Sequence, residues 1–166
     1  MSKASSIRSL TCNPLAPLVL VLWLMASGFC CPLYLNPGSC LCKPFGHHRI
    51  SITCKGITNI PRDLPPNTAI LDVSINKVEL IPEKAFQNLT SLTRLNLSWN
   101  MLKLIPDKAF QNLTSLTYLD LSWNMLKLIP DKAFQNLMSL TNLVLKMNML
   151  KLIPEKALQN LTSLTH

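Results

Sequence analysis

Residues 89–112 read LTSLTRLNLSWNMLKLIPDKAFQN, and residues 113–136 read LTSLTYLDLSWNMLKLIPDKAFQN. The two 24-residue blocks differ at only two positions. Residues 137–160 keep the same period with seven changes, and a further copy begins at Leu161. A fixed period of this length predicts a solenoid, because each block is one supersecondary unit that buries its apolar side only by stacking on its neighbours.

The alternation of side chains in each block predicts a short strand. In the second block, Leu119 and Leu121 fall on one face, and Tyr118, Asp120 and Ser122 fall on the other. Equivalent strands stacked at about 4.8 Å form a parallel sheet with one strand per repeat. Proline cannot donate a hydrogen bond to this sheet, so we expect the chain to leave it and return through a turn or short helix. These prolines are Pro106, Pro130 and Pro154.

The repeated positions form the pattern LxxLxLxxNxLxxIPxxaFxxL. This pattern resembles the leucine-rich repeat of extracellular proteins, and the resemblance covers residues 64–166 as about four repeats, the last incomplete. It implies an α/β solenoid: a right-handed coil with a concave parallel sheet and with short turns or helices on the convex side. An asparagine follows each strand, where burial would oblige its amide to hydrogen-bond the backbone. We interpret these residues as a structural ladder: Asn76, Asn100, Asn124 and Asn148.

The first 28 residues are typical of a secretory signal peptide. Lys3 and Arg8 precede an apolar run over residues 15–25, and residues 26–28 supply small side chains for cleavage. The run is too short for the roughly 20 apolar residues of a spanning helix. We therefore expect a secreted or extracellular chain, or the extracellular part of a membrane receptor.

Cysteine usage agrees with export and predicts a disulfide-bonded cap over residues 29–63. The segment resembles the N-terminal cap of extracellular leucine-rich-repeat proteins, and that resemblance implies two disulfides, Cys31–Cys42 and Cys40–Cys54. Cys30 is left over, so it stays free, pairs between chains or displaces Cys31.

No metal, cofactor or catalytic site is expected. The pair His47-His48 lies between cysteines, but mixed zinc sites need reduced thiolates. We interpret the pair as solvated loop histidines. Catalysis needs dissimilar groups that converge on one point, whereas this sequence supplies rows of similar groups. The chain is therefore not expected to be an enzyme.

The chain is basic, with 16 Lys and Arg against 8 Asp and Glu, a formal net charge of +8. Removal of two basic residues with the signal would leave 14 against 8, or +6. The lysine rows lie outside the strands, which favours a solvated face; the alternative is binding of heparan-like glycans or acidic microbial surfaces. Nucleic acid is not expected, since the rows lack interleaved aromatic residues. The rows are Lys103, Lys127 and Lys151, and Lys84, Lys108, Lys132 and Lys156.

The differences between repeats fall on the exposed face of the sheet. Between the first two full blocks the only changes are Arg94 to Tyr118 and Asn96 to Asp120. Exposed convex positions scarcely change, so this pattern favours diversified recognition of a protein or glycoconjugate over free drift. The predicted ligand-binding residues are Arg94, Asn96, Trp99, Tyr118, Asp120, Trp123, Asn142, Val144 and Lys146.

Two further sets of residues recur near the strands. Trp99 and Trp123 are one coil apart, so they stack on each other as a structural pair or as a ligand platform. A row of methionines and a row of leucines follow the strands, and we expect them mainly to line and shield the core. Any of these side chains that stay exposed could pair two solenoids. These rows are Met101, Met125 and Met149, and Leu104, Leu128 and Leu152.

Four sequons predict N-glycosylation sites: Asn88, Asn96, Asn112 and Asn160. The first, third and fourth occupy one repeat position, at the turn into the next repeat. Asn96 instead projects from the strand face, where a glycan would cover part of the predicted binding surface.

The last repeat begins at Leu161 and includes six residues, ending at His166. We expect an open last coil that exposes Leu143, Leu145, Leu150 and Ile153, and a chain that is a fragment of a longer receptor or a truncated product. A partner or second copy covering this end is the alternative. The repeats and cap most resemble toll-like receptor ectodomains and variable lymphocyte receptors, which implies innate recognition. The alternative class is a secreted matrix or adhesion protein similar to small leucine-rich proteoglycans.

Overall fold

The computed structural model describes residues 39–166. The predicted signal peptide, residues 1–28, and the first two cysteines of the predicted cap, Cys30 and Cys31, lie outside the described residues. No helix among residues 39–166 is long and apolar enough to cross a bilayer.

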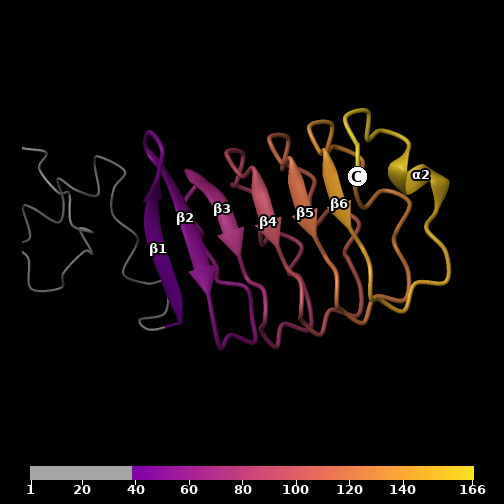
Figure 1. The fold of residues 1–166 in the computed structure, drawn as a ribbon, viewed down its shortest axis with the longest axis horizontal. Coiled ribbons are helices and arrows are strands. Elements are labelled where there is room, and N and C mark those ends of the chain that lie inside the picture. The colour runs from indigo at the N-terminus through magenta and orange to yellow at the C-terminus, as the bar shows by residue number, and fades with distance from the viewer. Residues whose placement is uncertain (1–38) are drawn as a thin grey trace, which may run out of the picture.

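One six-stranded sheet runs the length of the solenoid in the order β1-β2-β3-β4-β5-β6 (Figure 1). β1 pairs antiparallel with β2, and every later pair is parallel. The parallel part therefore has one strand per repeat, as the sequence predicted. The strands are β1 Cys40–Phe45, β2 Arg49–Cys54, β3 Thr68–Asp72, β4 Arg94–Asn96, β5 Tyr118–Asp120 and β6 Asn142–Val144.

The core is a continuous stack of leucines and phenylalanines behind the sheet. Leu95 and Leu119 on β4 and β5 are completely buried. On the convex side, Phe110 lies between the phenylalanines of the preceding and following coils, with ring centroids 6.0 and 6.2 Å apart. Because each coil buries the same positions against the next, the apolar interior has no single centre.

The post-strand asparagines connect neighbouring coils. The Asn124 amide oxygen accepts the Leu102 N–H at 3.0 Å, and its amide nitrogen donates to the Leu97 carbonyl at 3.0 Å, both on the preceding coil. The same nitrogen donates to two carbonyls of its own coil. Asn76, Asn100 and Asn148 repeat this arrangement. Backbone groups that the short strands leave unpaired are satisfied in this way.

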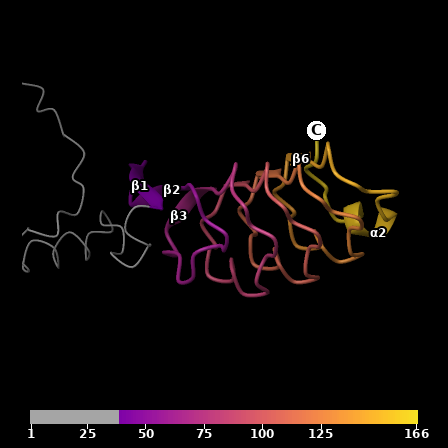
Figure 2. The ribbon, with the colours of Figure 1, turned by 90° about the horizontal axis from the view of Figure 1, so that it is seen from below.

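The convex side consists of turns that start at the repeated prolines. The Ala109 N–H donates to the Pro106 carbonyl at 3.0 Å, and the equivalent bond from Ala133 to Pro130 is 3.1 Å. Only the last repeat has a helix among the described residues, α2 Glu155–Leu158. Figure 2 shows the sheet along one side of the molecule and the turns along the other.

The cap and the repeats share the sheet. β2 pairs with β1 on one edge and with β3 on the other, and Cys40 lies opposite Cys54 across the first pair. These cysteines form the disulfide that the family resemblance implied. Cys42 is also disulfide-bonded, and Cys31, its predicted partner, lies outside the described residues.

The prediction that the methionine and leucine rows mainly line the core was wrong. Met101 is 41% and Leu104 52% exposed, whereas Leu102 and Ile105 beside them are buried. After the strand the chain turns, so strict alternation is lost and both Lys103 and Leu104 face outward. Only the pattern LxxI points inward in this segment.

The last coil is less buried than the others. Leu143, Leu145 and Leu150 are half-buried and Ile153 is 40% exposed. The equivalents in the preceding repeat, Leu119, Leu121, Leu126 and Ile129, are all buried. Residues 161–166 begin the next coil, where the Leu143 N–H donates to the His166 carbonyl at 2.8 Å.

Candidate functional site: the exposed face of the sheet

The strand register sets the outward side chains in two rows across the repeats. Arg94 lies beside Tyr118 and Tyr118 beside Asn142, while Asn96, Asp120 and Val144 form the parallel row. Strands of three residues carry only two outward side chains each. The diverging positions of the repeats therefore become spatial neighbours.

Three of the predicted residues form a connected cluster. The Arg94 guanidinium lies 4.6 Å from the centre of the Tyr118 ring, within the range of a cation–π contact. The Tyr118 hydroxyl donates to a carboxylate oxygen of Asp120 at 3.2 Å. The other carboxylate oxygen accepts the Ser122 N–H at 2.9 Å. A cation, a phenol and a carboxylate are thus presented together on one exposed face.

The pKa of Tyr118 is raised above its ordinary value. Partial burial is the main cause, and the Asp120 carboxylate adds to it by its charge and by accepting the hydroxyl proton, while Arg94 opposes the shift. Each effect of burial and of Asp120 favours the neutral phenol. Tyr118 therefore remains a hydrogen-bond donor at neutral pH.

We expect Asp120→Asn to lower the pKa of Tyr118, and Arg94→Gln to raise it further. The check is a spectrophotometric phenolate titration in a Tyr34→Phe background, since the chain has only two tyrosines. Because the folded-state pKa lies above the unfolded value of about 10, the stabilisation is complete below pH 10 and is lost as pH rises through the folded-state pKa. If neither substitution changes the pKa of Tyr118, the predicted interactions of Tyr118 with Asp120 and Arg94 are wrong.

The two tryptophans stack face to face just beyond the carboxyl ends of β4 and β5. Their ring centroids are 4.1 Å apart with an interplanar angle of 10°, and Trp99 remains 51% and Trp123 38% exposed. Both backbones are left-handed, with φ of 55° and 54°, as are Ile75 and Met147 at the same repeat position. Since non-glycine residues rarely adopt this conformation, the turn itself imposes it. The pair supports the structure and still offers an aromatic surface, so both interpretations of it stand.

The remaining predicted residues lie beside the cluster without joining it. Asn96 uses its amide oxygen to accept bonds from the Ser98 N–H and hydroxyl. Asn142 accepts the Thr141 hydroxyl at 2.8 Å, Val144 is half-buried, and Lys146 is exposed. Asn142 and Val144 extend the face onto β6, and Lys146 follows that strand.

Sequence reasoning missed the part of the face contributed by β3. Ile70 is the register neighbour of Arg94, and Asp72 is the neighbour of Asn96. The Asp72 carboxylate accepts the Ser74 N–H at 2.9 Å, as Asp120 does with Ser122. Aligning the degraded first repeat on the others would have placed both residues in the variable positions.

The sequon asparagines occupy two environments. Asn88, Asn112 and Asn160 are exposed at the turns that lead into the next strand. Asn112 donates from its amide nitrogen to the Gln87 carbonyl of the preceding coil at 2.9 Å. Asn96 is half-buried on the sheet face. A glycan on the turns would leave the sheet face open.

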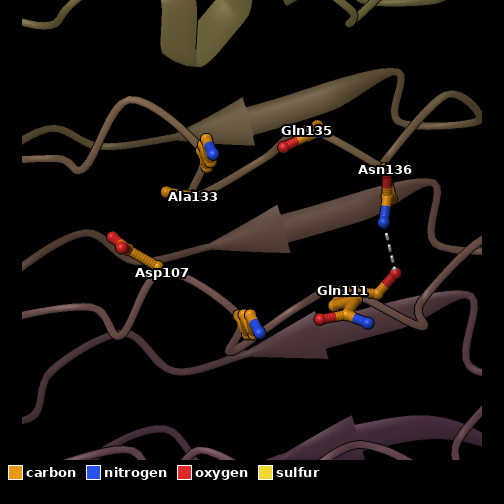
Figure 3. A pocket seen from close by; sticks show the side chains of 7 residues that line it. Asp107, Gln111, Ala133, Gln135 and Asn136 are labelled. Atoms are coloured by element: carbon orange, nitrogen blue, oxygen red, sulfur yellow. Dashed lines mark hydrogen bonds between the residues drawn. The ribbon is translucent and has the colours of Figure 1, made fainter.

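The hollows of the described surface lie mainly on other sides of the molecule. The one in Figure 3, about 350 Å³, is between successive convex turns and includes the hydrogen bond from Asn136 to the Gln111 carbonyl at 3.0 Å. A second, about 250 Å³, repeats it one coil earlier with Lys84, Lys108 and Gln111. Both follow from coil stacking. Within residues 39–166 no three His, Cys, Asp or Glu side chains gather as metal ligands.

Comparison with known proteins agrees with this geometry. Residues 66–126 match the family model described as leucine rich repeat. The fold is a leucine-rich-repeat solenoid. The chain is 34% identical over 90 residues to "Leucine-rich repeat-containing protein 3" of Rattus norvegicus, a match that covers 51% of this chain and 33% of that protein.

Two other relatives carry membrane or receptor terms in their names. The chain is 39% identical over 62 residues to "Leucine-rich repeat and transmembrane domain-containing protein 1" of Mus musculus, covering 36% of this chain and 17% of that protein. It is 38% identical over 71 residues to "Leucine-rich repeat-containing G-protein coupled receptor 4" of Bos taurus, covering 43% of this chain and 7% of that protein. The chain therefore spans a third or less of these curated relatives.

Proposed function

We propose that this chain is an extracellular recognition module that binds a protein or glycoconjugate on the exposed face of its sheet, without catalysis. The observation that carries the proposal is the cluster of Arg94, Tyr118 and Asp120. It lies in the positions at which otherwise near-identical repeats differ. Arginine and tyrosine are among the residues that contribute most to protein interfaces.

The finer assignment is a toll-like innate immune receptor ectodomain. Its support is the sequence resemblance of the repeats and cap, together with relatives whose names include a receptor and a transmembrane protein. The disulfide between Cys40 and Cys54 suits an exported chain. On this proposal the sheet face meets its ligand outside the cell, and glycans at Asn88, Asn112 and Asn160 would leave that face open.

A matrix or adhesion protein of the small proteoglycan type is the second candidate. The exposed convex row of Lys84, Lys108, Lys132 and Lys156 favours it, because summed basic charge attracts sulfated glycans. Charge reversal at Lys108 and Lys132 must then abolish retention on heparin. Retention that survives this change would remove the glycan part of the proposal.

We expect Tyr118→Ala and Asp120→Ala each to weaken ligand binding by about tenfold or more, as for residues at the centre of an interface. The measurement is capture of the labelled chain on an array of purified cell-surface ectodomains and glycans. The double variant Lys108→Ala/Gln111→Ala on a convex turn is the matched control. Binding lost in the control and kept in the sheet variants would favour the matrix protein.

A further inference from the structure

The exposed apolar surface of this protein is concentrated on one side. Residues 39–166 include 15 large apolar side chains that are exposed, and 11 of them belong to the segments directly after the strands. We call residues 75–80, 99–104, 123–128 and 147–152 the post-strand flank. Figure 1 shows these segments side by side along one edge of the solenoid, below the arrowheads of β3 to β6.

The exposure does not depend on the last coil. In the two inner segments, Trp99, Met101 and Leu104, and Trp123, Met125 and Leu128, are 38% to 58% exposed although a coil lies on each side. These six side chains alone expose on the order of 600 Å², which reaches the upper range for the largest apolar patch of a typical monomer. Such a surface marks an interaction site.

Backbone hydrogen bonds hold the rows of the flank in register. The Met125 N–H donates to the Leu102 carbonyl at 2.9 Å, and the Met149 N–H donates to the Leu126 carbonyl at the same distance. The Trp99 N–H donates to the Ser122 carbonyl at 3.0 Å. The apolar rows are thus fixed beside one another as a continuous surface.

A row of positive charge runs through the apolar surface. Lys103, Lys127 and Lys151 lie between the methionine and leucine rows, and Lys77 takes the methionine position of the first repeat. The flank has one acidic residue, Glu79, whose carboxylate is 2.8 Å from the Lys103 ammonium. With four lysines and one glutamate the flank has a net charge of +3. Its partner must therefore be both apolar and anionic.

We propose that the post-strand flank docks on the surface of an anionic phospholipid membrane. Lysine is depleted from the centres of protein–protein interfaces, but here it lies within the apolar surface. At a membrane the lysine stems would lie along acyl chains while their ammonium groups reach phosphates. Tryptophan and leucine are the residues that enter this interface, and a paired tryptophan presents two amphipathic rings.

Charge disfavours a second copy of the chain as the occupant. A twofold contact through this flank would bring the lysine rows of both copies together, because such an interface uses the same patch on each subunit. Like charges across an interface oppose association. An anionic lipid surface neutralises the same row.

The proposal is tested by sedimentation of the full-length protein with vesicles of phosphatidylcholine, alone or mixed with an equal part of phosphatidylserine. We expect binding to the mixed vesicles only, weakening with salt. The triple variant K103Q/K127Q/K151Q should bind about 100-fold more weakly, at about fivefold per lysine. K84Q/K108Q/K132Q on the convex turns makes the same charge change and should bind nearly as well as the unmodified protein.

A second measurement needs no change to the flank. In a Trp23→Phe background Trp99 and Trp123 are the only tryptophans, and brominated lipid in the mixed vesicles should quench their fluorescence. The proposal would be overturned if the two triple lysine variants lost vesicle binding equally. It would also be overturned if tryptophan fluorescence stayed unquenched in protein bound to the vesicles. The proposal would also be overturned if the protein bound neither kind of vesicle and formed a dimer that the double variant Leu104→Ser/Leu128→Ser dissociated.

Discussion

Phe110→Ala should lower the free energy of unfolding by about 3–5 kcal/mol, the usual loss for a buried phenylalanine truncated to alanine. The side chain is 1% exposed and lies between Phe86 and Phe134. Its removal leaves a cavity bordered by rings of both neighbouring coils. The sheet on the other side of the core cannot close this space, because its strands are fixed at the parallel spacing.

Phe110→Leu provides the matched control. The last full repeat has Leu158 at this position, so the fold already accommodates leucine there. We expect this change to cost less than about 1.5 kcal/mol, because most of the volume is kept. Urea unfolding of both variants, followed by circular dichroism with the disulfides intact, checks the prediction. Equal midpoints for the two variants would mean that the phenylalanine stack does not support the convex side.

Asn124→Ala should lower the free energy of unfolding by about 2–4 kcal/mol. The side chain is 7% exposed and makes four hydrogen bonds to backbone groups, two of them on the preceding coil. Alanine would leave the Leu102 N–H buried without its acceptor. An unsatisfied buried donor costs about 1–3 kcal/mol, and the carbonyls lose their donor at the same time.

Asn136→Ala is the control for this second prediction. Asn136 lies in the same repeat but makes one bond, to the Gln111 carbonyl, at the protein surface. It is followed by Leu137-Met138, so it is not a sequon and its removal changes no glycan. We expect this variant to lower the free energy of unfolding by less than about 1 kcal/mol. A comparable loss in both variants on thermal unfolding would show that the ladder has no special role.

Much of the fold could be predicted because each repeat encodes it independently. The positions of Leu119 and Leu121 specify the inner face of a strand, Asn124 the turn after it, and Pro130 the start of the convex turn. Because the repeats have nearly the same sequence, equivalent residues of neighbouring strands pair with each other. The β1–β2 hairpin of the cap could not be predicted in this way, since it occurs once and no second copy shows its periodicity.

The candidate site was predicted as a set of positions and not as a set of contacts. The variable columns identified Arg94, Tyr118 and Asp120, but the alignment that gives the columns does not say that the guanidinium covers the ring. The recurring apolar rows that include Met101 and Leu104 were assigned mainly to the core, because a hydrophobic residue gives no sign of its direction where the chain turns. Both outcomes depend on local backbone geometry.

The sequence by itself determined the period, the inward leucines and phenylalanines, and the residues that vary along the sheet, because hydrophobic spacing is a property of the chain alone. Only the tertiary structure decided which outward side chains meet. Arg94 and Tyr118 are 24 residues apart and touch because parallel pairing brings their strands together in register. The left-handed residue after each strand likewise turns the tryptophan, methionine and leucine rows outward into one continuous surface.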